Sequence, residues 1–206
     1  MITPLDNTIK NVMEFTWPMI LICVLTIASI RITDIIKNKK TFILHKEIFL
    51  LLFLIYILCL FQVVTFEDQS LYNTGNNLVP FKEIMRYKLG SHLFFKNVIG
   101  NVVLFIPYGL FISLYTKLDK PFHATCLVLF ASVTVEITQL AIGRVFDIDD
   151  IILNLIGGLI GYIIYRVITK IYDSLPKIFK SNWFLNILSV LLLVGLVSYL
   201  GMVMIR

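Results

Sequence analysis

Charged residues are scarce in this chain, and their scarcity already limits what the protein can be. Asp, Glu, Lys and Arg make up 15% of its 206 residues, whereas ordinary soluble domains contain about 25%. Hydrophobic residues make up 58%, and the mean hydropathy is +0.89. This composition excludes a secreted disulfide scaffold, a disordered tail and a soluble nucleic-acid-binding domain. The sequence therefore predicts an integral membrane protein that does not have nucleic acid as a partner.

Cysteine is rare as well. The three cysteines, Cys23, Cys59 and Cys126, lie inside apolar segments without CxxC or CxxH spacing. We therefore expect buried helix residues at these positions, and neither a disulfide nor a metal site. The sequence also lacks the GxSxG, HExxH, P-loop and acid-phosphatase motifs. No motif implies a cofactor, and the pattern favours a protein without enzymatic activity while leaving catalysis open.

Six apolar segments are present, and most approach the roughly 20 residues that a membrane helix needs. They are Phe15–Ile32, Ile48–Phe66, Val98–Thr116, Pro121–Ile142, Ile151–Ile171 and Trp183–Ile205. The predicted fold is an all-α, polytopic membrane bundle of about six transmembrane helices. We divide the chain into residues 1–47 (the first span and a basic cytoplasmic loop), residues 48–171 (a core of four spans) and residues 172–206 (the last span).

The distribution of basic residues predicts the orientation of these spans. With the N-terminus outside, the inner loops hold eleven Lys and Arg residues and the outer regions hold seven. Cytoplasmic loops usually carry the excess of positive charge. We therefore expect both termini to be extracellular.

The long connection 67–97 is outside in this orientation. Its first part is polar and contains Glu67, Asp68, Asn73, Asn76 and Asn77. From Phe81 to Leu93, apolar residues recur at helical spacing, with Lys82 and Arg86 on the opposite side. This pattern predicts a short helix in the membrane interface, with these two bases contacting lipid phosphates. A cap packed over the helix bundle would give the same pattern, and the two interpretations are compatible.

Glu136 lies within the fourth span, three residues before Gln139, so the two side chains share one helical face. A carboxylate within a span costs about 2–3 kcal/mol on insertion scales, and it usually faces a bundle interior or a wet cavity. We interpret Glu136 as a functional residue. The alternative is a protonated Glu136 that is hydrogen-bonded to a neighbouring helix.

A dense polar group follows between the fourth and fifth spans. It comprises Arg144, Asp147, Asp149, Asp150 and Asn154. Asp147 or Asp149 can cap the fifth helix, and acids suit its first turn. Capping does not account for Asn154, which shares a face with Asp147 and Asp150. Arg144 can pair with one of the acids or hold an anionic group.

Asn101 adds an amide near the outer start of the third span, so the polar residues of three spans fall in one layer. The sequence predicts a polar pocket at the outer leaflet, formed by Asn101, Glu136, Gln139, Arg144, Asp147, Asp150 and Asn154. Gly157, Gly158 and Gly161 in the fifth span permit close helix contact, and we interpret them as packing residues.

Four motifs stand in order along the chain. They are Asn77-Leu-Val-Pro-Phe81, Gly100-Asn101-x-x-Leu104-Phe105-x-Pro107-x-Gly109, Glu136-x-x-Gln139 and Gly143-Arg144-x-x-Asp147-x-Asp149-Asp150-x-x-x-Asn154-x-x-Gly157. Together they resemble the VanZ-like family over roughly residues 50–165. The resemblance implies a multi-span protein of the bacterial cell membrane and, for the founding member, a role in resistance to the glycopeptide teicoplanin. It carries the seven pocket residues over as motif positions, without catalytic roles.

Three functions are compatible with these features. The first is a non-enzymatic envelope protein that binds a membrane lipid or a lipid-linked cell-envelope precursor and reduces glycopeptide access. The second is a membrane enzyme acting on a lipid-linked phosphate or sugar, with Mg²⁺ or Mn²⁺ held by the acids and the phosphate held by Arg144. The third is a transporter, which is the least favoured because no inverted repeat is evident. The oligomeric state is left open.

Overall fold

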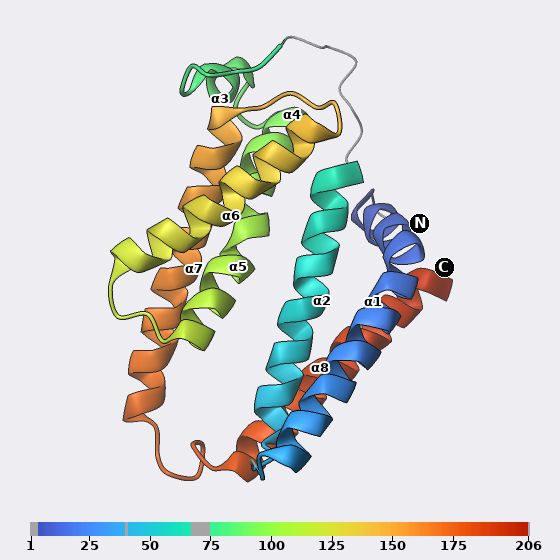
Figure 1. The fold of residues 1–206 in the computed structure, drawn as a ribbon. Coiled ribbons are helices and arrows are strands. Elements are labelled where there is room, and N and C mark those ends of the chain that lie inside the picture. Colours follow the sequence, from blue (N-terminus) through green and yellow to red (C-terminus); the bar gives the residue numbers. More distant parts are fainter. Residues whose placement is uncertain (1–3, 40, 67–74, 206) are drawn as a thin grey trace. The chain divides into compact units, whose positions relative to one another are not determined.

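The computed structural model describes residues 4–39, 41–66 and 75–205, and its regular elements are helical (Figure 1). In chain order they are α1 (Pro4–Lys37), α2 (Leu44–Phe66), α3 (Lys82–Arg86), α4 (His92–Phe94), the π-helix η1 (Phe95–Ile99), α5 (Gly100–Thr116), α6 (Pro121–Ala141), α7 (Ile148–Ser174) and α8 (Asn182–Ile205). Extended pairing in the described part of the chain is limited to one parallel bridge between Asn77 and Asp147. The predicted all-α class is confirmed.

Six of these helical stretches are long and apolar enough to cross a membrane. They are Thr16–Lys37, Leu44–Val63, His92–Thr116, Pro121–Ala141, Ile148–Ser174 and Asn182–Tyr199. The six predicted segments are therefore confirmed, and the chain is a multi-pass membrane protein. Among the candidate spans, the largest difference at a start is in the third, because α4 and η1 lead directly into α5 and extend the helical stretch back to His92.

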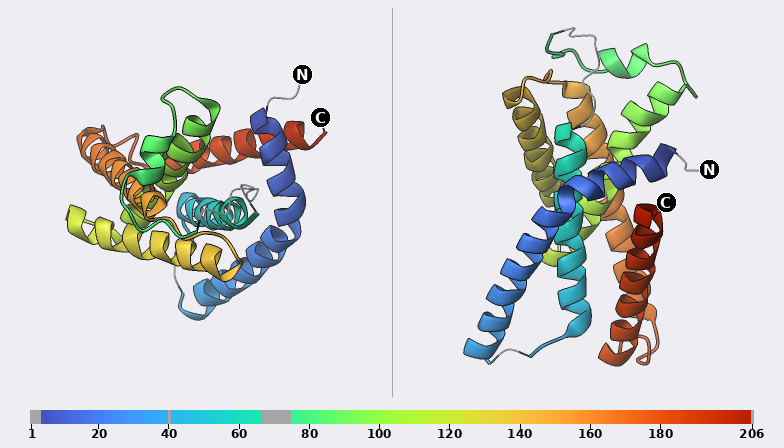
Figure 2. Two further views of the ribbon diagram at one scale, coloured as in Figure 1. Left: turned by 90° about the horizontal axis from the view of Figure 1, so that it is seen from above. Right: turned by 90° about the vertical axis from the view of Figure 1, so that its right-hand side faces the viewer.

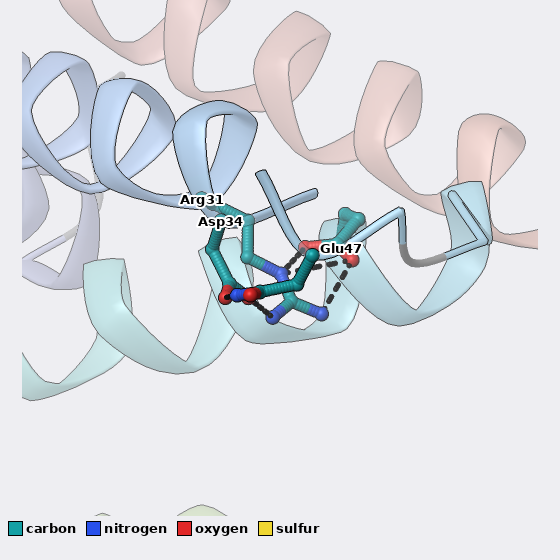
Figure 3. A network of polar contacts seen from close by, with 4 residues as sticks. Arg31, Asp34 and Glu47 are labelled. Atoms are coloured by element: carbon teal, nitrogen blue, oxygen red, sulfur yellow. Dashed lines mark hydrogen bonds and ion pairs between the residues drawn. The ribbon is translucent and has the colours of Figure 1, made fainter. Parts of the chain in front are cut away.

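The chain forms two compact units, and each is described by itself. The first contains residues 1–62 and 174–206. Here the end of α1 is joined to the start of α2 by Arg31, whose Nε lies 2.9 Å from Oε2 of Glu47 (Figure 3). Asp34, one turn after Arg31, accepts a second bond from the same guanidinium at 3.2 Å. One arginine thus orders both sides of the loop between the first two spans.

The second unit contains residues 63–173, and α5, α6 and α7 lie side by side in it (Figures 1 and 2). Glycines bring α5 and α7 into backbone contact. A Cβ at Gly109 would lie 2.0 Å from the carbonyl oxygen of Gly158, and one at Gly161 would lie 2.1 Å from that of Ile106. Gly157 makes the same kind of approach to the backbone of α5. The packing interpretation of these α7 glycines is confirmed, because a larger side chain has no room there.

Helix α6 completes this bundle through one buried stripe. The stripe consists of Ala124, Val128, Ser132, Glu136 and Gln139. Their spacing of three or four residues places them on one helical face. The stripe is apolar where α6 begins and polar where it ends, so the polar side chains collect at one end of the bundle.

The segment before α5 contains the predicted short helix, but this helix is shorter than the apolar pattern from Phe81 to Leu93 that predicts it. Helix α3 ends at Arg86, and the chain becomes helical again at His92. Gly90 lies between them with φ of +79°, a left-handed conformation that interrupts an α-helix. The apolar spacing up to Leu93 therefore spans two short helices. Of the polar residues predicted for this connection, Glu67, Asp68 and Asn73 lie outside the described residues.

Candidate functional site

The N-terminus of α3 is bound by a carboxylate from another helix. Asp149, in the first turn of α7, is 1% exposed. Its Oδ2 accepts hydrogen bonds from the backbone N–H groups of Glu83 at 2.7 Å and Ile84 at 3.2 Å. Its Oδ1 accepts one from Phe81. Since a carboxylate is a favourable acceptor for the unsatisfied N–H groups of a helix start, Asp149 fixes the position of α3 on the bundle.

Asn77 makes a second connection at the same level. Its backbone N–H donates to Phe146 at 2.8 Å, and its carbonyl accepts from Ile148 at 3.0 Å. Its side-chain amide donates to Oδ1 of Asp147 at 2.8 Å. Asn77 is buried, and these bonds satisfy its backbone groups and engage its side-chain amide. The chain before α3 is therefore held against the chain before α7.

Asp147 caps α7, as one of the sequence interpretations predicted. It directly precedes the helix, and its Oδ1 accepts from the backbone N–H of Asp149 at 2.8 Å. Burial raises the pKa of the Asp147 carboxyl, while the bonds from Asp149 and Asn77 oppose that shift. The nearby charges of Asp149 and Glu83 add to the increase.

Glu136 joins the end of α6 to this loop. It is 1% exposed, and its Oε2 accepts a 2.9 Å hydrogen bond from the backbone N–H of Asp147. Arg144 lies within electrostatic range of Glu136. The backbone of Arg144 in turn donates to the carbonyl of Gln139 at 2.9 Å. The turn between α6 and α7 is thus folded back onto the end of α6.

Two amides connect the helices of the bundle. Asn101, in the first turn of α5, donates from Nδ2 to Oδ1 of Asp150 in the first turn of α7. One turn deeper, Asn154 donates from Nδ2 to Oγ of Ser132 on α6 at 3.0 Å. Asn154 and Ser132 are both buried. Each amide therefore has a partner on a neighbouring helix, as a buried amide in a membrane bundle requires.

The two predicted phosphate contacts lie on α3. Lys82 and Arg86 are both exposed. Arg86 forms an ion pair with Glu83, with Nη1 and Oε2 3.2 Å apart.

Tyr87 follows α3 and is half-buried. Burial raises the pKa of its hydroxyl, and the negative charges of Glu83 and Asp150 act in the same direction.

All seven predicted pocket residues belong to the same end of the α5–α6–α7 bundle. Hydrogen bonds join Asn101 to Asp150, Asn154 to Ser132, and Glu136 to the backbone of Asp147. Gln139 is buried on the polar part of the α6 stripe. In the described part of the chain, no three His, Cys, Asp or Glu side chains are grouped closely enough to hold a metal ion.

Three residues outside the predicted site are central to its structure. They are Asn77, Ser132 and Asp149. Helical spacing in the fifth span groups Asp147, Asp150 and Asn154 on one face and does not include Asp149. The motif containing Asn77 offered a signal, because its Val79-Pro80 turn brings a polar residue close to the start of a helix. Ser132 lies one turn before Glu136 on the same α6 face, which was a second signal.

Comparisons with known proteins agree with this architecture. Residues 47–169 match the VanZ/LLP1 family. The chain is also 32% identical to Protein VanZ of Enterococcus faecium over 148 residues, which cover 68% of this chain and 86% of that protein. The matched region contains every site residue described above. No solved structure matches the chain. This protein therefore belongs to the VanZ/LLP1 family of multi-pass membrane proteins.

Proposed function

We propose that the protein binds a cell-envelope lipid or a lipid-linked envelope precursor at the polar end of the α5–α6–α7 bundle. In this proposal the polar end faces the outer leaflet and both chain termini are extracellular, as the distribution of basic residues predicts. Binding there reduces glycopeptide access to the envelope and contributes to teicoplanin resistance. The role is one of binding and does not require a chemical step.

One observation carries the proposal. The polar side chains of three membrane helices are concentrated at one end of the bundle, where Asn101, Asp150 and Arg144 are only partly buried. Amides, a carboxylate and a guanidinium at the edge of a bilayer are suited to the phosphate, sugar or peptide groups of an envelope precursor. A membrane protein that needed only to anchor itself would gain nothing from placing these groups there, because each is costly to insert.

The resistance part of the proposal is tested by deletion. Removing the gene from its bacterium should lower the teicoplanin concentration that inhibits growth, and the wild-type gene supplied in trans should restore it. Complementation with Asp150→Asn should fail if Asp150 belongs to the binding site. Asp173→Asn is the matched control, because Asp173 is exposed near the opposite end of α7. Membrane levels of each variant separate loss of binding from loss of folding.

Unchanged susceptibility after deletion would remove the resistance claim. The binding claim has its own measurement, which uses the full-length protein in lipid nanodiscs with undecaprenyl phosphate as the probe. We expect the probe to raise the unfolding temperature of the wild type and of Asp173→Asn, and to have less effect on Asp150→Asn. A probe that stabilises all three proteins equally, or none of them, contradicts a site at Asp150.

A further inference from the structure

We propose that the exposed surface of residues 78–89, here called the cap face, docks onto the anionic phospholipid headgroups of the leaflet beside it. It is defined by the apolar residues Leu78, Val79, Phe81, Met85 and Leu89 and the basic residues Lys82, Arg86 and Lys88. The inference concerns the bilayer and not the envelope ligand. It holds whichever side of the membrane the cap face occupies.

The first observation is the exposure of large apolar side chains outside the membrane spans. Met85 and Leu89 are each 81% exposed, and Phe81 is 50% exposed. The candidate spans nearest to them are Leu44–Val63 and His92–Thr116, so none of the three is within a span. Large apolar side chains exposed together in one short segment are typical of an interaction with a membrane or with another protein.

The second observation is the depth of the cap face relative to the membrane, which two attachments determine. At its C-terminal end it reaches Leu89, only three residues before the span that starts at His92. Near its N-terminal end, the backbone N–H groups of Phe81, Glu83 and Ile84 are bound by Asp149, which is the second residue of the span Ile148–Ser174. Both attachments lie at the first residues of membrane spans. The cap face is therefore kept at the boundary between the hydrocarbon and the water.

The third observation is charge. Between residues 75 and 99 the sequence has four Lys and Arg residues and one acid, Glu83. Glu83 is paired with Arg86, and its side chain is only 18% exposed. The exposed charges of the cap face are thus positive, with Lys82, Arg86 and Lys88 all exposed. Exposed bases beside exposed apolar residues, at the membrane boundary, are complementary to anionic headgroups.

These three observations select a lipid surface over a protein partner. A protein partner would have to compete with the bilayer at this depth, whereas the lipid is always present. Met85 and Leu89 would enter the boundary between headgroups and acyl chains, about 5–10 Å deep for such segments. The bases would contact the phosphates, with each contributing about a fivefold preference for an anionic surface.

The test uses the full-length protein in vesicles, with Ser replacing the three native cysteines and a spin label on Met85→Cys. The reference label is placed on Asp119→Cys, since the Asp119 side chain is 91% exposed in the loop at the other end of the bundle. Collisions with oxygen report lipid contact, and collisions with a water-soluble nickel chelate report water contact. Both are measured in vesicles of phosphatidylcholine and in vesicles that also contain phosphatidylglycerol.

We expect the label at position 85 to be more accessible to oxygen and less accessible to nickel than the Asp119→Cys label, and the difference to grow with phosphatidylglycerol. The combined substitution Lys82→Gln, Arg86→Gln and Lys88→Gln should abolish the dependence on phosphatidylglycerol. The combined Gln substitution of Lys117, Lys120 and Lys170, three bases at the opposite end, should leave it intact. Equal nickel accessibility at both label positions would overturn the proposal. The preference for anionic lipid would be overturned if the label at position 85 were equally inaccessible to nickel with and without phosphatidylglycerol. It would also be overturned if the dependence on phosphatidylglycerol survived the combined substitution of Lys82, Arg86 and Lys88.

Discussion

The backbone N–H of Glu83 donates a 2.7 Å hydrogen bond to Oδ2 of Asp149, across 66 residues of sequence. The backbone N–H groups of Phe81 and Ile84 donate to the same carboxylate, so one buried side chain accepts three hydrogen bonds at the start of α3. The position of the cap face relative to the membrane bundle therefore depends strongly on a single side chain.

Replacing Asp149 should release α3. Asp149→Ala leaves three backbone N–H groups without their acceptor, and we expect the free energy of unfolding to fall by about 2–4 kcal/mol. Asp119→Ala is the control. Asp119 is exposed and its side chain pairs with Arg166 only at 3.7 Å, so the change should be within about 0.5 kcal/mol. Unfolding in detergent, followed by circular dichroism, measures both. Equal effects of the two substitutions would contradict the capping role.

The contact between α5 and α7 should not tolerate a methyl group. Gly109→Ala places a Cβ 2.0 Å from the carbonyl oxygen of Gly158, and we expect a loss of about 1–3 kcal/mol or more. Gly195→Ala in α8 meets no atom within 4 Å. It should be neutral or stabilise by about 0.5–1 kcal/mol, because alanine favours the helix. Denaturant titrations should show a loss of stability for Gly109→Ala alone, and a comparable loss for Gly195→Ala would count against the close approach.

Ser132 and Asn154 should be energetically coupled. Removing either side chain leaves the other polar group buried without its 3.0 Å partner. A double-mutant cycle of Ser132→Ala and Asn154→Ala should give a coupling energy of about 0.6 kcal/mol, and at most about 1.7 kcal/mol. In the control cycle, Asn154→Ala is combined with Ser113→Ala, whose hydroxyl bonds within α5 to the carbonyl of Gly109. That cycle should be additive within about 0.3–0.5 kcal/mol.

Asp147 should make stability depend on pH. Burial raises its carboxyl pKa above the ordinary value of 3.8, so the folded protein holds the proton more tightly than the unfolded chain. The resulting stabilisation is complete below the unfolded pKa and is lost as the pH rises through the folded pKa. Asp147→Asn keeps an oxygen acceptor for Asn77 and Asp149 but cannot ionise. The unfolding temperature of Asp147→Asn relative to the wild type should therefore increase as the pH rises from about 4 toward neutrality. A difference that is constant with pH would contradict this assignment.

The polar residues of the site were found from the sequence for a simple reason. Glu136 and Asn154 stand out because polar groups are rare in spans and costly to insert. Their partners were not evident. The partner of Asn154 is Ser132 on α6, because the small hydroxyl lies opposite it where α6 and α7 pack. Ser132 is an unremarkable residue in hydropathy, and only the contact between the helices reveals its role.

For α3, the sequence pattern predicted a helix correctly but made it too long. Apolar spacing from Phe81 to Leu93 is helical in period, yet α3 ends at Arg86. Gly90 adopts a left-handed conformation, and Asp149 binds the start of α3. Periodicity reports which side chains share a face, and it does not report where a tertiary bond begins a helix.

The sequence by itself determined the six spans, the all-α class, the glycine contact surface of α7 and the layer in which the polar side chains lie. These properties follow from each residue's own cost of transfer into lipid and from the 3.6-residue repeat of the helix. Only the tertiary structure decided that Asp149 binds α3, that Asn77 pairs with Asp147 and that Ser132 pairs with Asn154. Hydrogen bonds require atoms within about 3 Å in a fixed orientation. That condition depends on how the helices pack and where the chain turns, and neither is written in local composition or periodicity.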